Sequence, residues 1–244
     1  MYRAMCASVP RFGINGHMPR DVSQLHYELI RGLMEGGVCP TNSAVAAAMG
    51  TSVADVEEGL RELASIHGVV LHPHVCEPWI LHPFSLTPTM HWIEGERGSW
   101  WAPCVWCALG VAALAGGRAR IHMRYGAEGE SLELDVVDGV PAREDIWVHF
   151  AIPPVRAWDN VHQHCALVLP FHSQEEIAEW CGRHGVALGE AVPIAKVARL
   201  ARTWYGSHAS PEWRKWSVAE AQDIFAGAGL TSDFWRLKAR DGHF

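Results

Sequence analysis

Residues 101–110 read WAPCVWCALG, and the rest of this 244-residue chain can be arranged around them. Cys104 and Cys107 form a C-x-x-C motif at the start of an apolar run that predicts a helix from about Val105 to Leu114. Such a motif is typical of a redox pair or of half a zinc site. A zinc site needs a second cysteine pair, and the sequence has no other C-x-x-C; a redox pair normally follows a strand of a βαβ unit, which is missing here. Burial of one or both cysteines as small apolar residues also stays open.

A second candidate motif is NVHQHCALVLPF, residues 160–171. It holds His162, His164 and Cys165, and its apolar run predicts a strand over Cys165–Leu169. In a strand, His162 and His164 share one face and Cys165 points to the other, so the three could bind one metal ion only if the chain bends. A metal site and a plain strand edge with a buried Cys165 are both compatible with this pattern.

The chain before residue 92 has a helical pattern. Apolar residues at helical spacing predict three helices within residues 22–68, and an extended segment broken by prolines follows. This outline indicates a winged-helix-like domain over residues 22–92, which could bind DNA through its third helix. The exposed face of that helix would repel phosphate, so we expect a scaffold that does not bind DNA. Its charged residues are Asp55, Glu57, Glu58 and Glu62 against one base, Arg61.

The pattern changes to strands after residue 92. Alternating or continuous apolar runs predict one mostly antiparallel or mixed sheet, flanked by helices. The fold class expected is therefore α+β, with a catalytic or binding domain over residues 93–204, an irregular leader over 1–21 and a Trp-rich extension over 205–244. The predicted strands are 119–125, 131–137, 146–150 and 165–169, and the predicted helices are 174–184, 192–204 and 217–226.

Composition restricts the class of protein. Hydrophobic residues make up 49% and charged residues 19%, as in a globular chain, and the net charge of −7 argues against nucleic acid as a partner. We expect no membrane span, because no apolar run approaches the roughly 18 residues that one needs. Without a secretion signal, a cytoplasmic and reducing location is expected, so the seven cysteines are interpreted as thiols. Four of them have no convincing partner: Cys6, Cys39, Cys76 and Cys181.

Taken in order, these motifs resemble the organomercurial (alkylmercury) lyase family. The family has an LTPT-like passage, here Leu86–Thr89, which leads into an aromatic-W-C-A-L motif, here Val105–Leu109. Its second cysteine begins a strand that ends in Phe, and a helical Trp follows. Cys165, Phe171 and Trp180 match that spacing.

This resemblance covers roughly residues 22–190 and implies a thiol-dependent carbon–mercury lyase. Mercury(II) is soft and prefers thiolate ligands, so Cys107 and Cys165 would be both the catalytic residues and the metal ligands. Two thiolates raise the electron density on the bound carbon, and an acid then protonates it, which releases hydrocarbon and leaves Hg(II) on sulfur. The partner would be an organometallic or other small molecule, with Hg(II) or another soft metal as substrate or product ligand and no cofactor required.

Gly110 departs from the family pattern. The family has an Asp three residues after its first cysteine, on the same helix face, and a Gly cannot donate a proton. Cys104 is expected as an accessory thiol and proton source, and His164 as an accessory imidazole. Other candidate proton donors are Glu94, Asp138, Glu144, Asp145, His149 and His162.

Two alternatives to carbon–mercury cleavage stay open. The chain could be a repurposed family member, a non-mercury enzyme with Cys107 as its nucleophile, or it could bind a soft metal or small molecule without catalysis. The enzyme interpretation requires that the two thiols share a pocket shielded from water, for which Trp100, Trp101 and Trp106 are the expected residues.

Overall fold

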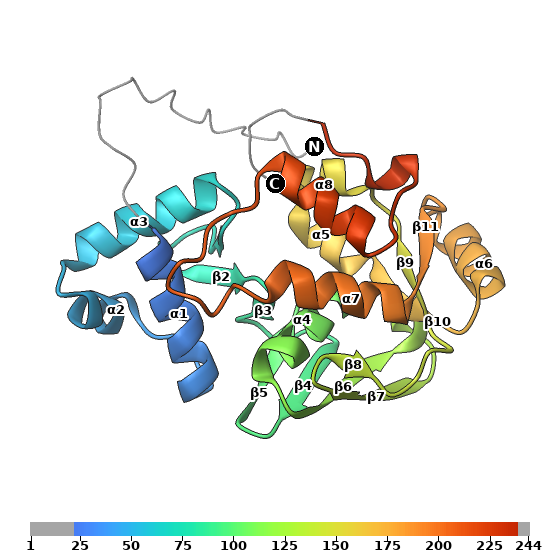
Figure 1. The fold of residues 1–244 in the computed structure, drawn as a ribbon, viewed down its shortest axis with the longest axis horizontal. Helices are drawn as coiled ribbons and strands as arrows, with labels where there is room; N and C mark the ends of the chain where they lie inside the picture. The colour runs from blue at the N-terminus through green and yellow to red at the C-terminus, as the bar shows by residue number, and fades with distance from the viewer. Residues whose placement is uncertain (1–21, 239–244) are drawn as a thin grey trace, which may run out of the picture.

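Three helices form the N-terminal part of the structure, a computed structural model that describes residues 22–238 (Figure 1). Ser52 begins the third helix with a capping box, because its side chain accepts a hydrogen bond from the Asp55 backbone N–H while the Asp55 carboxylate accepts one from the Ser52 backbone N–H. The three predicted helices are confirmed, whereas the winged-helix resemblance stays a prediction. They are α1 (Ser23–Gly36), α2 (Asn42–Met49) and α3 (Val53–Ser65).

An eight-stranded antiparallel sheet follows, in the order β1-β2-β3-β5-β4-β6-β7-β8. In β7, Leu132, Leu134 and Val136 are buried and the residues between them are exposed, as the alternating pattern predicted. The predicted domain boundary at residues 92 and 93 falls within β4 and stays a prediction. The strands are β1 (Val70–Leu71), β2 (Pro78–Leu81), β3 (Phe84–Ser85), β4 (His91–Gly95), β5 (Gly98–Ala102), β6 (Arg118–Arg124), β7 (Ser131–Val137) and β8 (Val140–Pro141).

A second, three-stranded antiparallel sheet has the order β10-β9-β11. The prediction of a single sheet was therefore wrong, although the α+β class is confirmed. Residues 146–150 form a largely apolar run, and Val148 and Phe150 are both fully buried. A run without alternation does not tell which sheet it joins. The strands are β9 (Trp147–Phe150), β10 (Val168–Phe171) and β11 (Glu190–Pro193).

The strand predicted over Cys165–Leu169 was also wrong at its first residues. Cys165 lies in a short helix, α5 (Val161–Ala166), and β10 begins only at Val168. Asn160 explains the difference, because its side chain caps the helix by accepting a hydrogen bond from the backbone N–H of Gln163.

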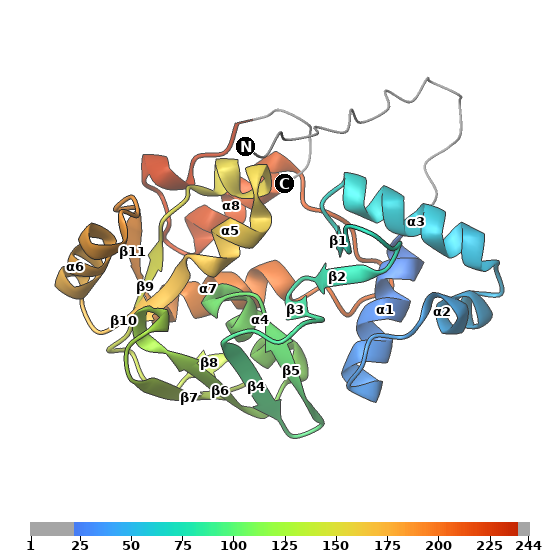
Figure 2. The ribbon, with the colours of Figure 1, turned by 180° about the vertical axis from the view of Figure 1, so that it is seen from behind.

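Two helices that pack against each other occupy the centre of the molecule. α4 (Val105–Ala115) is buried on nearly every side, and it packs against both α7 (Ile194–Tyr205) and the strands β4, β5 and β6 (Figures 1 and 2). A helix that is apolar all round is typical of such a position between layers. The outer helices are α6 (Gln174–His184), beside the second sheet, and α8 (Val218–Gly227), beside α7.

The Trp-rich C-terminal segment belongs to the core. The ring of Trp213 stacks on His26 of α1 with 3.6 Å between ring centroids. The fully buried Trp235 donates a hydrogen bond from its indole nitrogen to Glu190 at 2.8 Å. This segment therefore joins the first helix to the second sheet. Within residues 22–238, no helix is both long and apolar enough to cross a bilayer.

Candidate thiol site

Three buried thiols line one cavity of about 50 Å³. Cys104 is the N-cap of α4, where its sulfur accepts a hydrogen bond from the Cys107 backbone N–H at 3.4 Å. Cys107 lies one turn further along the same helix, and Cys165 comes from α5. The structure thus brings the two motifs of the sequence together in one place.

A histidine completes this cluster. His82 lies in the turn between β2 and β3 and lines the cavity. Its ring nitrogen and the sulfurs of Cys107 and Cys165 all lie within 4.8 Å of one another, a separation that allows all three to bind one metal ion. Burial, together with the nearby charge of Lys215, lowers the pKa of His82 to about 3, so its imidazole is neutral at physiological pH.

The three thiols differ in their tendency to ionise. Burial opposes ionisation of Cys104, but hydrogen bonds from the Cys107 and Cys165 thiols and from the Cys107 backbone N–H outweigh it and hold the Cys104 pKa well below its usual value. Burial and the hydrogen bond to Cys104 raise the pKa of Cys107, and the hydrogen bond to Cys104 does the same for Cys165. The cluster therefore carries one thiolate, on Cys104 at the helix N-terminus.

A tyrosine fills the space next to Gly110. Gly110 lies three residues after Cys107 in α4, and a Cβ atom built on it would lie only 2.2 Å from Cδ2 of Tyr205 in α7. The Tyr205 hydroxyl lies 3.3 Å from the sulfur of Cys107, within hydrogen-bond distance for a thiol. Burial and the neighbouring Cys107 raise the pKa of Tyr205 well above its usual value, so the phenol keeps its proton. The absent side chain at position 110 is thus what allows Tyr205 to reach the thiols.

The outer wall of the cavity is aromatic and basic. Lys215 donates a hydrogen bond to the backbone oxygen of His67 at 3.0 Å, and its ammonium lies 5.0 Å from the ring centroid of Trp158. Trp158, in the 3-10 helix η2 (Pro154–Asp159), stacks on His67 at 4.2 Å between ring centroids. Burial lowers the pKa of Lys215 to about 7. These residues border the cavity together with the three thiols.

Comparison with known proteins gives the family. A model of the alkylmercury lyase family, MerB, matches residues 84–206, just over half of the chain. The chain belongs to the alkylmercury lyase family. Among solved structures, the "mercury-bound form of MerB2" superposes with a TM-score of 0.61 at 17% identity, over 78% of this chain and 93% of that one, which shows a shared fold. No curated protein sequence matches the chain.

The tryptophan shield predicted for this lyase-family site was only partly right. Trp106 lines the thiol cavity, but Trp100 and Trp101 line a different pocket beside α1 and α2. The indole nitrogen of Trp100 donates instead to the backbone oxygen of Leu33 at 3.0 Å. Trp101 packs instead against Trp92 of β4, with 4.5 Å between ring centroids. The other tryptophans of the cavity wall are Trp158, Trp204 and Trp213.

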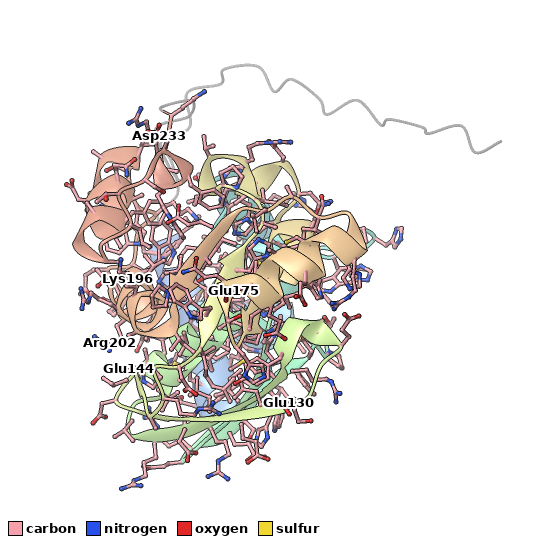
Figure 3. The ribbon with its side chains drawn as sticks, turned by 90° about the vertical axis from the view of Figure 1, so that its right-hand side faces the viewer. Glu130, Glu144, Glu175, Lys196, Arg202 and Asp233 are labelled. Atoms are coloured by element: carbon pink, nitrogen blue, oxygen red, sulfur yellow. The ribbon has the colours of Figure 1, made fainter. Side chains whose placement is uncertain are left out.

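Most of the proton donors considered from the sequence lie outside the cavity. Glu94 pairs with His122 on the exposed face of β4, at 3.1 Å, and Asp138 accepts a hydrogen bond from the Gly117 backbone N–H at 3.0 Å. Glu144 is exposed in the loop before β9 (Figure 3), as is the neighbouring Asp145.

The predicted histidines divide between three places. His149 lies against Cys181, with 3.8 Å between its Nε2 and the sulfur, and His162 lines an adjacent pocket beneath β3. His164 lines the thiol cavity, and burial lowers its pKa. Of the accessory residues named from the sequence, Cys104 and His164 are therefore the two that the fold brings to Cys107 and Cys165.

Several residues of the cavity were missed in the sequence, among them His82, Trp158, Tyr205 and Lys215. One signal was available for Tyr205. A glycine within a strongly apolar helix, such as Gly110, often marks the close approach of another group. His82 and Lys215 lie in irregular segments and Trp158 lies in the short 3-10 helix η2, and the sequence there has no period and no motif.

Proposed function

We propose that this family member binds an organomercurial through Cys107 and Cys165 and cleaves its carbon–mercury bond by protonation. The observation that carries the proposal is the convergence of three thiols and a neutral imidazole on one cavity. Mercury(II) has its highest affinity for thiolate sulfur, and the sulfurs of Cys107 and Cys165 lie close enough to bind one metal ion together with the His82 ring. Gly110, in place of the family's acid, means that another group must supply the proton.

Capture of the substrate would begin with the Cys104 thiolate, which acts as a base. As the mercury of R–Hg⁺ forms a bond to Cys165, the Cys165 proton passes to Cys104, which is already its hydrogen-bond partner. As the second sulfur, Cys107, then approaches the metal and gives up its own proton, the bond between mercury and carbon weakens and the carbon takes up a proton. The burial of all three cysteines strengthens this electrostatic effect, because a charge interacts more strongly in a low-dielectric interior.

Titration of the full-length protein with Hg(II) and with methylmercury tests the proposal. Cys107→Ser and Cys165→Ser should each weaken metal binding and abolish methane release. Cys181→Ser is the matched control, because Cys181 is also a buried free thiol but does not line the cavity. If the double variant at 107 and 165 binds Hg(II) as tightly as the wild type does, the proposal is wrong.

A second candidate function is binding without cleavage. It is supported by the side chains of residues 22–238 that line the cavity, which include imidazoles, thiols, a phenol and an amine but no carboxylate. A protein that retains methylmercury on two sulfurs but releases no methane would have this function. A third alternative, Cys107 as the nucleophile of a non-mercury enzyme, is less well supported, since the raised pKa of Cys107 leaves Cys104 as the thiolate.

A further inference from the structure

The contact between Tyr205 and Cys107 spans the two central helices. Tyr205 is the last residue of α7, and its side chain crosses to α4 exactly where Gly110 offers no side chain. Its hydroxyl lies 3.3 Å from the Cys107 sulfur, and either atom can be the donor. Tyr205 and Cys107 both line the thiol cavity, so the phenol and the thiol border the space in which a substrate would bind.

We propose that Tyr205 is a catalytic residue that relays a proton from the Cys107 thiol to the carbon bound to mercury. This inference rests on the proposed function and adds the group that delivers the proton. The phenol would stand in for the acid that the helix lacks at position 110, and it would reach the thiol from the neighbouring helix.

The relay balances in atoms and electrons. Mercury is bound to Cys165 and to the alkyl carbon when the Cys107 sulfur approaches. The S–H proton of Cys107 passes to the Tyr205 oxygen while the O–H proton of Tyr205 passes to carbon. The Cys107–mercury bond forms, and the carbon–mercury bond breaks with its electron pair retained by carbon, which becomes R–H. Tyr205 ends as a neutral phenol and mercury ends on two sulfurs, so no oxidant, reductant or further acid is needed.

The other groups of the cavity are less suited to this step. The Cys104 sulfur accepts the hydrogen bond from the Cys107 backbone N–H and takes up the Cys165 proton, so it acts as the base of the first step. No hydrogen bond joins His82 or His164 to Cys107, whereas the Tyr205 hydroxyl already contacts its sulfur. Tyr205 alone of these groups therefore has both the contact and a neutral O–H.

Single-turnover release of methane from methylmercury, measured beside Hg(II) binding, tests the relay. Tyr205→Phe removes only the hydroxyl. It should bind Hg(II) and methylmercury as the wild type does. Its methane release should be slower by a factor of roughly 100 or more, which is the scale of a lost general acid. Tyr125→Phe, which alters a buried tyrosine of the 3-10 helix η1 (Tyr125–Ala127) outside the cavity, should change neither quantity.

A second measurement needs no variant. In the wild type, the single-turnover rate in mixtures of H2O and D2O should depend on the deuterium fraction along a curve, because two protons move in one step. A linear dependence would indicate a single proton and overturn the relay.

The outcomes separate the relay from the function on which it rests. Methane release by Tyr205→Phe at the wild-type rate overturns the relay and leaves the lyase function standing. If Tyr205→Phe loses metal binding as well as methane release, Tyr205 has a structural role only, and this result also overturns the relay. If the wild type itself binds methylmercury and releases no methane, the proposed function has failed.

Discussion

Gly110 and Tyr205 occupy one space between α4 and α7, since a Cβ atom on Gly110 would lie 2.2 Å from Cδ2 of the Tyr205 ring. An acid introduced there by Gly110→Asp should therefore destabilise the protein and should not raise the rate of methane release above that of the wild type. Overpacking of a core costs about 1–3 kcal/mol, which urea unfolding measures. Gly182→Ala is the control, because Gly182 lies in α6 with no atom within 4 Å of the added Cβ. That change should raise the free energy of unfolding by up to about 1 kcal/mol.

Removal of the tyrosine should reverse this effect. In the double variant Gly110→Asp with Tyr205→Ala, the carboxylate has the space of the phenol and lies one helical turn from Cys107. We expect the double variant to unfold at a higher urea concentration than Gly110→Asp alone and to release methane faster than Tyr205→Ala alone. If the two substitutions change the free energy of unfolding additively, the side chains at positions 110 and 205 do not compete for one space.

Cys104 should be the thiol that ionises first. The pKa of Cys104 is held well below its usual value, whereas those of Cys107 and Cys165 are raised. Thiolate absorbance in the ultraviolet, followed against pH, should therefore persist below the usual range of cysteine ionisation in the wild type and disappear in Cys104→Ser. Cys181→Ser should leave that low-pH signal unchanged, because burial raises the pKa of Cys181. A signal that survives in Cys104→Ser would assign the thiolate to another residue.

The size of the cavity should select short alkyl groups. A volume of about 50 Å³ is far below the roughly 150 Å³ of an apolar cavity that accepts benzene. We expect a higher kcat/KM for methylmercury than for phenylmercury. Trp158→Ala, which opens the outer wall, should bring the kcat/KM for phenylmercury closer to that for methylmercury. Trp92→Ala, which alters a different pocket, should leave the difference between the two substrates unchanged. Equal rates for both substrates in the wild type would show that the wall opens by itself.

His26 should make the protein sensitive to acid. Burial, together with the charge of Lys215, lowers its pKa to about 3, compared with 6.5 when unfolded. Between these values the unfolded chain binds a proton that the folded chain does not, so the free energy of unfolding falls as the pH drops below 6.5. At pH 5, His26 alone should account for about 2 kcal/mol of this loss.

The substitution His26→Phe tests this assignment, because a phenyl ring keeps the stacking on Trp213 and has no proton to gain. Urea unfolding at pH 7 and pH 5 should show a smaller loss of stability in the variant than in the wild type. Parallel losses in the two proteins would assign the acid sensitivity to other buried groups.

Local features of the chain were predictable from the sequence because they depend on neighbours in the chain. Apolar spacing and N-caps such as Ser52 place the helices, and alternation places β7. The start of α4 at the C-x-x-C motif and the resemblance to the alkylmercury lyase family also came from short motifs of adjacent residues. The Asn160 cap shows the limit of such patterns, since one side-chain hydrogen bond made a helix where apolar residues predicted a strand.

Only the tertiary structure decided how the thiol site is completed. The sequence by itself determined which thiols could bind a soft metal and that position 110 has no acid. The packing of α7 on α4 determined that Tyr205 fills that position, and the turn between β2 and β3 brought His82 to the sulfurs. The physical reason is that these contacts join residues far apart in the chain, so their energies depend on how helices and sheets pack and leave no period or motif in the sequence.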